Sequence, residues 1–552
     1  MRLFSIWAVV LAVFVIVTSA LGGYRYFSPI PYWDQWDSYI GFYERLQQGP
    51  FAAFWGWHTQ HRIVFSKLLF LLDIELFGGW NIFTVVMNYV LLLGVGLVIW
   101  HEYRLGRVKD GALSNQQSPW LIVGLIFGFL FAWCQFENLK SGFQSPFIAV
   151  YLFALLAFAA YSRPEHPFRR VALAILFSWL ATISMGNGIA TFVVLIGQGI
   201  LLRRPWKEAA AFAVVGIVTA IIYFQGYHNH LPHPPVSSLE RALALLWYVV
   251  IFLGNPFYFA ADFPVPSTSL SAAAGLCYLL VASQVIGVLF FRRQITPWRA
   301  FLAAIIAMVV AAAAGAASGR WMLGLPSAMA SRYTTPTLMG YLALSLLVLD
   351  IATSRWARFN AMLVPLIALT AVAGFQMQAS GDTGYLYDGK LAVLGQKTGL
   401  DHPIYDAAVY PAGEHDNFVA KANFAAAKNI GPYGGGWLHD AGVVKFDSAQ
   451  VDTKLCEGFL DTQTEDDVGL VVSGWAVMLP FKQASLLIVL VDADGQTAGY
   501  GVTGGSRPDV VAAYKGAPGD SGWIGFAKRT GQSLRAYAYV SDKFCPLASV
   551  SH

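Results

Sequence analysis

Charged residues are scarce in this chain of 552 residues, at 12% of the total. Soluble globular domains carry about twice that share. Long windows of the sequence contain no charge at all, which excludes a wholly soluble protein and predicts that a lipid bilayer surrounds much of the chain. The net charge is only +4, and no run of Lys and Arg indicates a nucleic-acid groove, so nucleic acid is not an expected partner.

Cysteine is also scarce, with four residues in the chain. Cys134 and Cys277 fall within apolar runs and are interpreted as inert packing residues. Cys456 and Cys545 bracket a C-terminal segment with a strand-like pattern, and an oxidising compartment would let them pair. We therefore predict a Cys456–Cys545 disulfide, with two free thiols as the alternative.

Apolar residues are abundant, at 56% of the chain. A run of about 20 apolar residues crosses the roughly 30 Å of bilayer hydrocarbon as a helix. The eleven predicted spans are about 5–23, 82–100, 119–136, 146–161, 171–187, 188–202, 209–226, 269–291, 300–318, 335–350 and 360–378. A twelfth apolar run, 240–258, is interpreted as an interfacial or re-entrant helix, because a crossing there would move the last two basic loops to the opposite side of the membrane.

The basic residues predict the orientation, because loops that carry Lys and Arg stay in the cytoplasm. They precede the first span and follow every second one. This pattern predicts a multi-pass protein of the bacterial inner membrane, with a cytoplasmic N-terminus and a periplasmic C-terminus. Residues 1–23 would alternatively be a signal peptide. The basic residues are Arg2, Arg104, Arg107, Lys109, Arg163, Arg169, Arg170, Arg203, Arg204, Lys207, Arg292, Arg293, Arg299, Arg355 and Arg358.

The composition changes after about residue 379. Short apolar or alternating runs such as 486–491 and 534–540, with an Asp494-Gly495 turn between them, predict several strands and a β-sandwich. The predicted organisation is an all-α polytopic membrane domain over 1–380, a periplasmic connecting region over 381–451 and a periplasmic β-sandwich domain over 452–552.

Polar side chains gather at the predicted outer ends of the spans and leave the span centres apolar. Ionisable groups are costly in lipid, so a cluster of them at the bilayer boundary predicts a functional site. The candidate residues are Trp33, Asp34, Trp36, Asp37, His58, His61, Arg62, Glu137, Asn138, Gln144, Asn187, Arg320, Arg332 and Tyr333.

Two carboxylates flanked by tryptophans follow the first span. Asp34 or Asp37 could act as a general base and accept hydrogen bonds from sugar hydroxyls. Trp33 and Trp36 could stack on a pyranose ring. The alternative interpretation is a helix-capping aspartate with interfacial tryptophan anchors.

Basic side chains occur on two other outer segments. His61 and Arg62 could bind a phosphate, and so could Arg320 and Arg332, for which lipid-headgroup contact is the alternative. His58 and His61 could instead ligate a metal together with Asp34. No metal ligands and no cofactor are assigned, and a divalent cation stays an alternative.

The layout resembles the GT-C superfamily of membrane glycosyltransferases over about 1–380. The resemblance rests on Trp33-Asp34-Gln35-Trp36-Asp37 after the first span and on the 240–258 stretch. The segments His61-Arg62-Ile63, Glu137-Asn138-Leu139, Gly186-Asn187-Gly188 and Ser331-Arg332-Tyr333 also look like those of bacterial membrane proteins of this broad kind. The acidic pair departs from the commoner Asp-X-Asp spacing. The tail looks like β domains appended to bacterial glycan enzymes.

The resemblance implies an inverting glycosyltransferase that moves a sugar from a polyprenyl-phosphate donor to a cell-envelope glycan or lipid-linked acceptor. Asp34 or Asp37 would be the base, and His61, Arg62, Arg320, Arg332 and Tyr333 would bind the donor phosphate. The remaining candidates would bind substrate. The alternatives are a polysaccharide ligase or polymerase, a lipid-linked sugar transporter or flippase, and a non-catalytic scaffold that displays the β domain.

Overall fold

The computed structural model describes residues 2–109, 118–164, 166–227, 235–258, 267–378, 384–400, 403–480, 485–529 and 531–549. The chain forms two compact units. Unit 1 comprises Met1–Phe27, Phe54–Leu69 and Phe83–Gly381, and unit 2 comprises Ser28–Ala53, Phe70–Ile82 and Asp382–His552. Most of the segment between the first two predicted spans, the first loop, therefore belongs to the same unit as the C-terminal region. The domain boundary predicted at residue 380 places this loop in the membrane domain instead.

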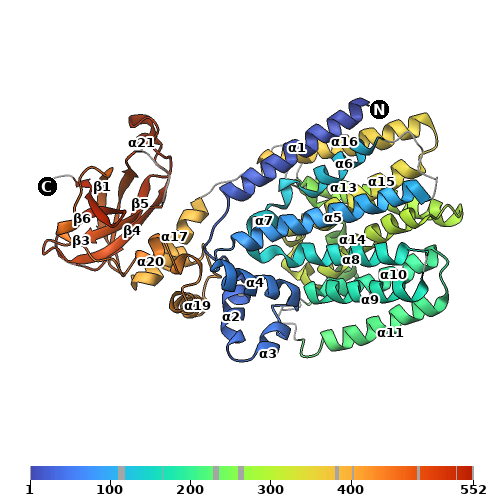
Figure 1. Cartoon of the computed structure of the whole chain (residues 1–552), viewed down its shortest axis with the longest axis horizontal. Coiled ribbons are helices and arrows are strands. Elements are labelled where there is room, and N and C mark those ends of the chain that lie inside the picture. The colour runs from blue at the N-terminus through green and yellow to red at the C-terminus, as the bar shows by residue number, and fades with distance from the viewer. Residues whose placement is uncertain are drawn as a thin grey trace. The chain divides into compact units, whose positions relative to one another are not determined.

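Ten helical segments of the described chain are long and apolar enough to cross a membrane, which confirms the predicted multi-pass helical domain. Lipid offers no hydrogen bonds to a backbone, so such apolar runs fold as helices. Figure 1 shows these helices, which are α1 (Arg2–Arg25), α5 (Ile82–Lys109), α6 (Pro119–Leu130) continued by α7 (Phe136–Lys140), α8 (Pro146–Ser162), α9 (Pro167–Ser184), α11 (Trp206–Tyr223), α13 (Ser267–Phe291), α14 (Pro297–Arg320), α15 (Thr334–Ile351) and α16 (Arg355–Gln378).

The sequence predicts eleven spans, and the difference lies at 188–202. That run forms α10 (Ala190–Leu201), whose 12 residues rise only about 18 Å, short of the hydrocarbon thickness. The 240–258 stretch overlaps α12 (Ser238–Leu253), which begins with a reciprocal cap between Ser237 and Glu240 and is not among the ten either.

Small residues let the membrane helices approach closely. A Cβ added to Gly124 of α6 would lie 2.6 Å from the Cβ of Ala8, so the backbones of α1 and α6 touch at this point.

Shorter helices complete the two units. They are α2 (Gly41–Leu46), α3 (Pro50–Trp55), α4 (Val64–Phe77), α17 (Gly384–Thr398), α18 (Pro403–Asp406), α19 (His415–Ala427), α20 (Trp437–Asp440) and α21 (Pro508–Ala513).

The C-terminal strands form one sheet of eight strands in the order β7-β6-β3-β4-β5-β2-β1-β8, where the sequence predicts the two sheets of a sandwich. All neighbours are antiparallel except β1 and β8. Because β7 and β8 follow each other in the chain but lie at opposite ends of this order, the sheet nearly closes. The strands are β1 (Cys456–Glu465), β2 (Leu470–Met478), β3 (Leu487–Val491), β4 (Thr497–Gly505), β5 (Gly522–Ala527), β6 (Arg535–Val540), β7 (Lys543–Pro546) and β8 (Ala548–Ser549).

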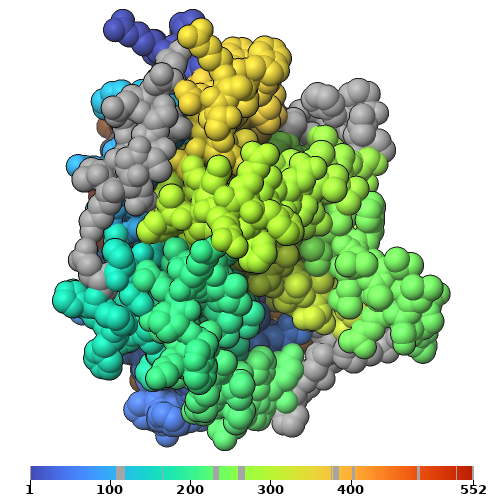
Figure 2. All heavy atoms as spheres, turned by 90° about the vertical axis from the view of Figure 1, so that its right-hand side faces the viewer, coloured from blue at the N-terminus to red at the C-terminus, as the bar shows by residue number. Residues whose placement is uncertain are grey.

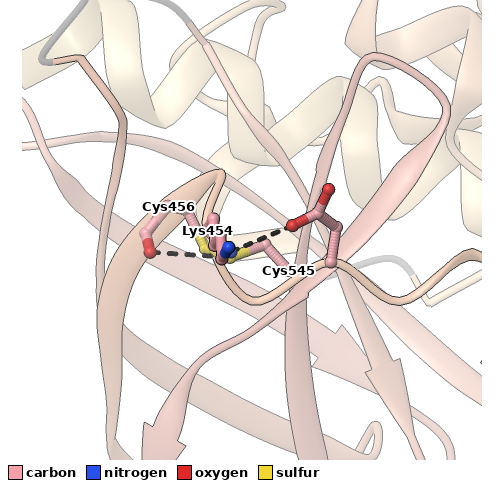
Figure 3. Close-up of a disulfide and its surroundings, with 4 residues drawn as sticks. Lys454, Cys456 and Cys545 are labelled. Carbon is pink, nitrogen blue, oxygen red and sulfur yellow. Dashed lines mark hydrogen bonds between the residues drawn. A yellow bond between two sulfur atoms is a disulfide. The ribbon is translucent and has the colours of Figure 1, made fainter.

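Both faces of this sheet are covered by apolar side chains. One face packs Val472, Ile488 and Trp523 inside the curled sheet, and the other packs Val489 against Leu394 of α17. The connecting region and the sheet therefore share a core. A disulfide between Cys456 of β1 and Cys545 of β7 joins one edge strand to the strand next to the opposite edge, which confirms the predicted pair (Figure 3).

Candidate functional site

The turn at 58–61 presents an imidazole beside a second turn of unit 1. The backbones of His58 and His61 exchange two N–H···O=C bonds of 2.8 Å, and Thr59 between them adopts a left-handed φ of +46°. Gly186, in the turn between α9 and α10, passes so close that a Cβ there would lie 3.0 Å from His61 Nδ1. A glycine at this position therefore lets the turn between α9 and α10 pass close to the imidazole.

Arg62 anchors the His58–His61 turn to the end of α11. Its Nε and Nη2 donate to the carbonyl oxygens of Tyr223 (2.8 Å) and Gln225 (2.6 Å), and its Nη1 donates to that of Trp55. The guanidinium also lies over the rings of Trp55 and Trp57, at 4.6 and 4.3 Å from their centres. Every nitrogen of this guanidinium thus makes a structural contact within unit 1.

A cavity of about 230 Å³ opens beside this turn, within unit 1. Its wall comes from the 58–62 turn, from α8, from the turn between α9 and α10, from the C-terminal end of α14, and from the start of α15. The polar lining residues are Gln60, His61, Tyr151, Asn187, Ser318, Arg320 and Tyr333, and the aromatic ones include Phe147, Phe224, Tyr227 and Phe252.

The electrostatics of this cavity favour an anion. Among its described lining residues, Arg320 is the one that is charged at neutral pH, and no described carboxylate pairs with it. Its guanidinium carbon lies 5.9 Å from the centre of the Tyr333 ring. Burial, and then the charges of Arg320 and His58, lower the pKa of His61 to about 3, so this imidazole is neutral at physiological pH.

Two buried polar atoms of the cavity wall have no partner within the described residues. They are Nδ1 of His61 and Oδ1 of Asn187. The amide of Asn187 is oriented by its Nδ2, which donates to the hydroxyl of Tyr151 at 3.1 Å. Buried polar atoms are rarely left unsatisfied. These two are therefore available to a ligand that carries both donors and acceptors.

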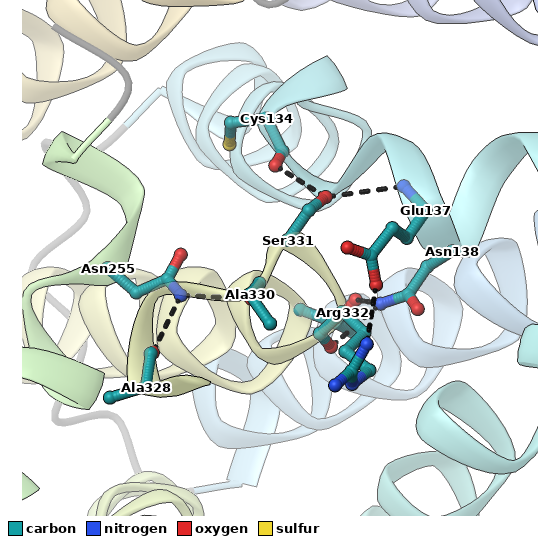
Figure 4. A network of polar contacts seen from close by, with 9 residues as sticks. Cys134, Glu137, Asn138, Asn255, Ala328, Ala330, Ser331 and Arg332 are labelled. Atoms are coloured by element: carbon teal, nitrogen blue, oxygen red, sulfur yellow. Dashed lines mark hydrogen bonds and ion pairs between the residues drawn. The ribbon is translucent and has the colours of Figure 1, made fainter. Parts of the chain in front are cut away.

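A polar network holds the loop that leads to Tyr333 (Figure 4). The hydroxyl of Ser331 donates to the carbonyl of Cys134 (3.0 Å) and accepts from the N–H of Glu137 (3.2 Å). The carboxylate of Glu137 pairs with Arg332 at 3.1 Å, and the amide of Asn138 donates to the Arg332 carbonyl at 2.9 Å. Glu137 and Asn138, predicted to bind substrate, and Arg332, predicted to bind the donor phosphate, all take part in this scaffold.

Asn255, just after α12, fixes the same loop from the other side. Its Nδ2 donates at 3.0 Å to the carbonyl oxygens of both Ala328 and Ala330, as Figure 4 shows. Its Oδ1 accepts from the hydroxyl of Thr334 at 2.5 Å. The position of Tyr333 in the cavity wall is therefore set by side chains from three separate segments of unit 1.

The acidic segment lies in unit 2, at a π-helical turn, Trp36–Ile40. Oδ1 of Asp37 accepts from the hydroxyl of Tyr410 and from Nζ of Lys421, both at 2.9 Å. Burial, and then this hydrogen bond to Asp37, raise the pKa of Tyr410. Trp36 is fully buried and its ring packs edge-on against Phe418 at 5.2 Å, so it has no free face for a sugar.

Trp33 differs from Trp36 in its exposure. Its side chain is 44% exposed, its φ is +47°, and its N–H donates to the carbonyl of Val409 at 2.8 Å. The neighbouring Tyr32 ring lies 5.9 Å away. Asp34 is exposed, and its charge contributes to the raised pKa of Tyr410. Of the two tryptophans, Trp33 alone therefore keeps an exposed ring.

The structure gathers four of the predicted site residues, His61, Asn187, Arg320 and Tyr333, around one cavity. His58 packs its ring against Phe143 at 5.1 Å, and neither His58 nor Gln144 is among the described residues that line the cavity. Sequence reasoning missed Tyr151, Gln60, Tyr410 and Lys421. Tyr151 could have been noticed as a phenol within an otherwise apolar run, whereas the other three carry no such signal.

No group of three or more His, Cys, Asp or Glu side chains in the described part of the chain is arranged to hold a metal ion. The predicted alternative of His58, His61 and Asp34 as ligands is therefore not assigned. In comparisons with known proteins, no family model, no curated protein and no solved structure matches this chain. The cavity combines a cation that no described carboxylate pairs with, neutral hydrogen-bonding groups and aromatic walls.

Proposed function

We propose that this chain is a membrane glycosyltransferase that moves a sugar from a polyprenyl-phosphate donor to a cell-envelope glycan or lipid-linked acceptor, at the periplasmic face of a bacterial inner membrane. The observation that carries the proposal is the half-buried Arg320 in the cavity of unit 1, which pairs with no described carboxylate. The unpartnered Nδ1 of His61 and Oδ1 of Asn187 line the same cavity.

The composition of the wall suits a phosphorylated sugar on a lipid. A guanidinium binds phosphate oxygens in two parallel hydrogen bonds and keeps its charge at any physiological pH. Aromatic rings such as Phe147 and Tyr333 offer flat apolar faces to a pyranose ring or a prenyl chain. The cavity is built on α8 and α14, two candidate membrane spans, so a donor could enter it from the bilayer.

In the proposed reaction an acceptor hydroxyl oxygen attacks C1 of the donor sugar. The bond from C1 to the phosphate oxygen breaks, its electron pair stays on that oxygen, and the anomeric centre inverts. Arg320 would stabilise the growing charge of the leaving phosphate. We assign this role to Arg320 because the guanidinium groups of Arg62 and Arg332 are engaged in structural contacts.

The attacking hydroxyl must lose its proton to a base. His61 is a poor candidate, because its pKa of about 3 leaves it little affinity for a proton. Asp34 and Asp37 stay the candidates that the sequence predicts, and their Asn variants test that role directly.

Binding of a polyprenyl phosphate to the purified full chain tests the proposal before any acceptor is known. We expect Arg320→Gln to raise the Kd about tenfold to hundredfold, because a hydrogen bond to a charged group contributes about 1.5–3 kcal/mol. Arg25→Gln is the matched control, since Arg25 is an exposed arginine in the last turn of another span. Equal affinity of the parent and Arg320→Gln would remove the phosphate role.

A further inference from the structure

A second cavity, of about 480 Å³, lies between the C-terminal ends of α10 and α13 in unit 1. Residues 200–203 from the end of α10 line one side, and Phe290, Phe291 and Arg293 from the end of α13 line the other. It shares no described lining residue with the first cavity. Figure 2 faces this end of unit 1, with a hollow between the green side chains near residue 200 and the yellow-green ones near residue 290.

The lining of this cavity is amphiphilic. Ile200 and Phe291 are exposed, at 61% and 82%, next to the ends of helices that are apolar along their length. Arg203 and Arg293 follow those helix ends directly and are also exposed. Apolar side chains beside a pair of guanidinium groups match a ligand that has an anionic head and hydrocarbon chains.

Arg203 and Arg293 keep their charge available for such a ligand. Other arginines near the same helix ends are neutralised by carboxylates within the chain. These ion pairs are Arg163–Glu102, Arg170–Glu208 and Arg299–Asp350. Within the described residues, neither Arg203 nor Arg293 forms an ion pair. Other exposed basic residues such as Arg169 and Arg292 form no ion pair with a described residue either, but Arg203 and Arg293 are the two that line one cavity together.

We propose that this cavity binds the headgroup of an anionic phospholipid, with the phosphate held between Arg203 and Arg293 and the acyl chains along the apolar ends of α10 and α13. Basic pockets between membrane helices bind such headgroups. A sugar-bearing donor is a poorer fit, because the other described lining residues, Ile, Leu and Phe, offer no side-chain hydroxyl or amide to a sugar. This site is independent of the proposed glycosyl transfer.

Native mass spectrometry of the full chain, released from phosphatidylglycerol or phosphatidylcholine nanodiscs, tests the proposal. The parent should retain phosphatidylglycerol and not phosphatidylcholine. Arg203→Gln with Arg293→Gln should weaken this retention about tenfold or more, since each basic residue near the bilayer surface contributes about 1 kcal/mol. The matched control is Arg169→Gln with Arg292→Gln, which removes the same charge from exposed positions that do not line the cavity.

Three results would overturn the proposal. Equal losses in the two double variants would show a general effect of charge. Equal retention of the two phospholipids would show that the phosphate charge is not recognised. Retention of added polyprenyl phosphate that persists in Arg320→Gln and is lost in the Arg203→Gln, Arg293→Gln variant would assign the cavity to a different lipid. A shared melting temperature and elution volume of parent and variants establish that each comparison is made on folded protein.

Discussion

The carboxylate of Asp37 and the ammonium of Lys421 lie 2.9 Å apart in unit 2, although the first residue comes from the first loop and the second from helix α19 of the connecting region. Tyr410, also from the connecting region, donates to the same carboxylate oxygen. The acidic segment is therefore held by the C-terminal part of the chain, from which it is separated by more than 370 residues in the sequence.

Lys421→Met tests this relationship. The side chain of Asp37 is 43% exposed, so solvent screens the pair, and its loss should lower stability by only about 0–1 kcal/mol. The local effect should be larger, because the segment 33–40 loses a tether. We expect faster amide hydrogen exchange in peptides that cover 33–40. Lys428→Met, an exposed lysine just after the same helix, is the control, and equal exchange in the two variants would show that the ion pair orders nothing.

The Cys456–Cys545 disulfide closes a loop with a sequence separation of 89. In the chain-entropy account, such a cross-link stabilises the folded state by about 4 to 5 kcal/mol. The double variant Cys456→Ser, Cys545→Ser should therefore become sensitive to limited proteolysis within the β domain. Cys277→Ser, at an exposed free cysteine, should not. Alkylation of both Cys456 and Cys545 in parent protein purified without reductant would contradict the bond.

The buried imidazole of His61 makes the folded chain less stable as the pH falls. Its pKa is about 3 in the folded chain and about 6.5 when unfolded, so acidification protonates the unfolded chain first. The contribution of His61 to the free energy of unfolding is complete above pH 6.5 and is lost as the pH falls toward 3. At pH 5 the free energy of unfolding has decreased by about 2 kcal/mol through this residue.

Thermal unfolding at pH 7 and pH 5 measures this effect. The Tm of the parent should fall more than that of His61→Gln, in which position 61 no longer titrates. His166→Gln, at an exposed histidine, should behave like the parent. If the parent and His61→Gln lose the same stability between the two pH values, the buried neutral state of His61 is wrong.

Much of the fold could be predicted because apolar length and alternation are local signals. The long apolar run of α1 and the short one of β3 are visible without a structure. The number of spans is harder to predict from the sequence, because α10 is as apolar as a span but ends after 12 residues. The near closure of the sheet depends on the two-residue strand β8 pairing with β1, and a strand that short has no pattern of its own.

Only part of the cavity lining could be predicted in this way. His61, Asn187, Arg320 and Tyr333 are polar or aromatic residues at the ends of apolar runs, and they line one cavity. The anchoring role of Arg62 was not predictable, because it depends on backbone carbonyls that the fold brings to its guanidinium.

The same limit applies to Trp36 and Asp37. Sequence shows that an aromatic and an acidic side chain are present, but not that Phe418 covers the first and Lys421 pairs with the second.

The most direct test of the central claim is sugar transfer from a radiolabelled polyprenyl-phosphate sugar, in membranes that contain native acceptors, at matched expression. Arg320→Gln should lower kcat/KM about 10²–10³-fold, by analogy with the loss of one fixed donor to a developing oxyanion. Asp34→Asn or Asp37→Asn should cost about 10²–10⁴-fold if that residue is the base. Arg25→Gln should transfer at the parental rate. Parental rates in Arg320→Gln and in both Asn variants would contradict the assignment of glycosyl transfer to this chain.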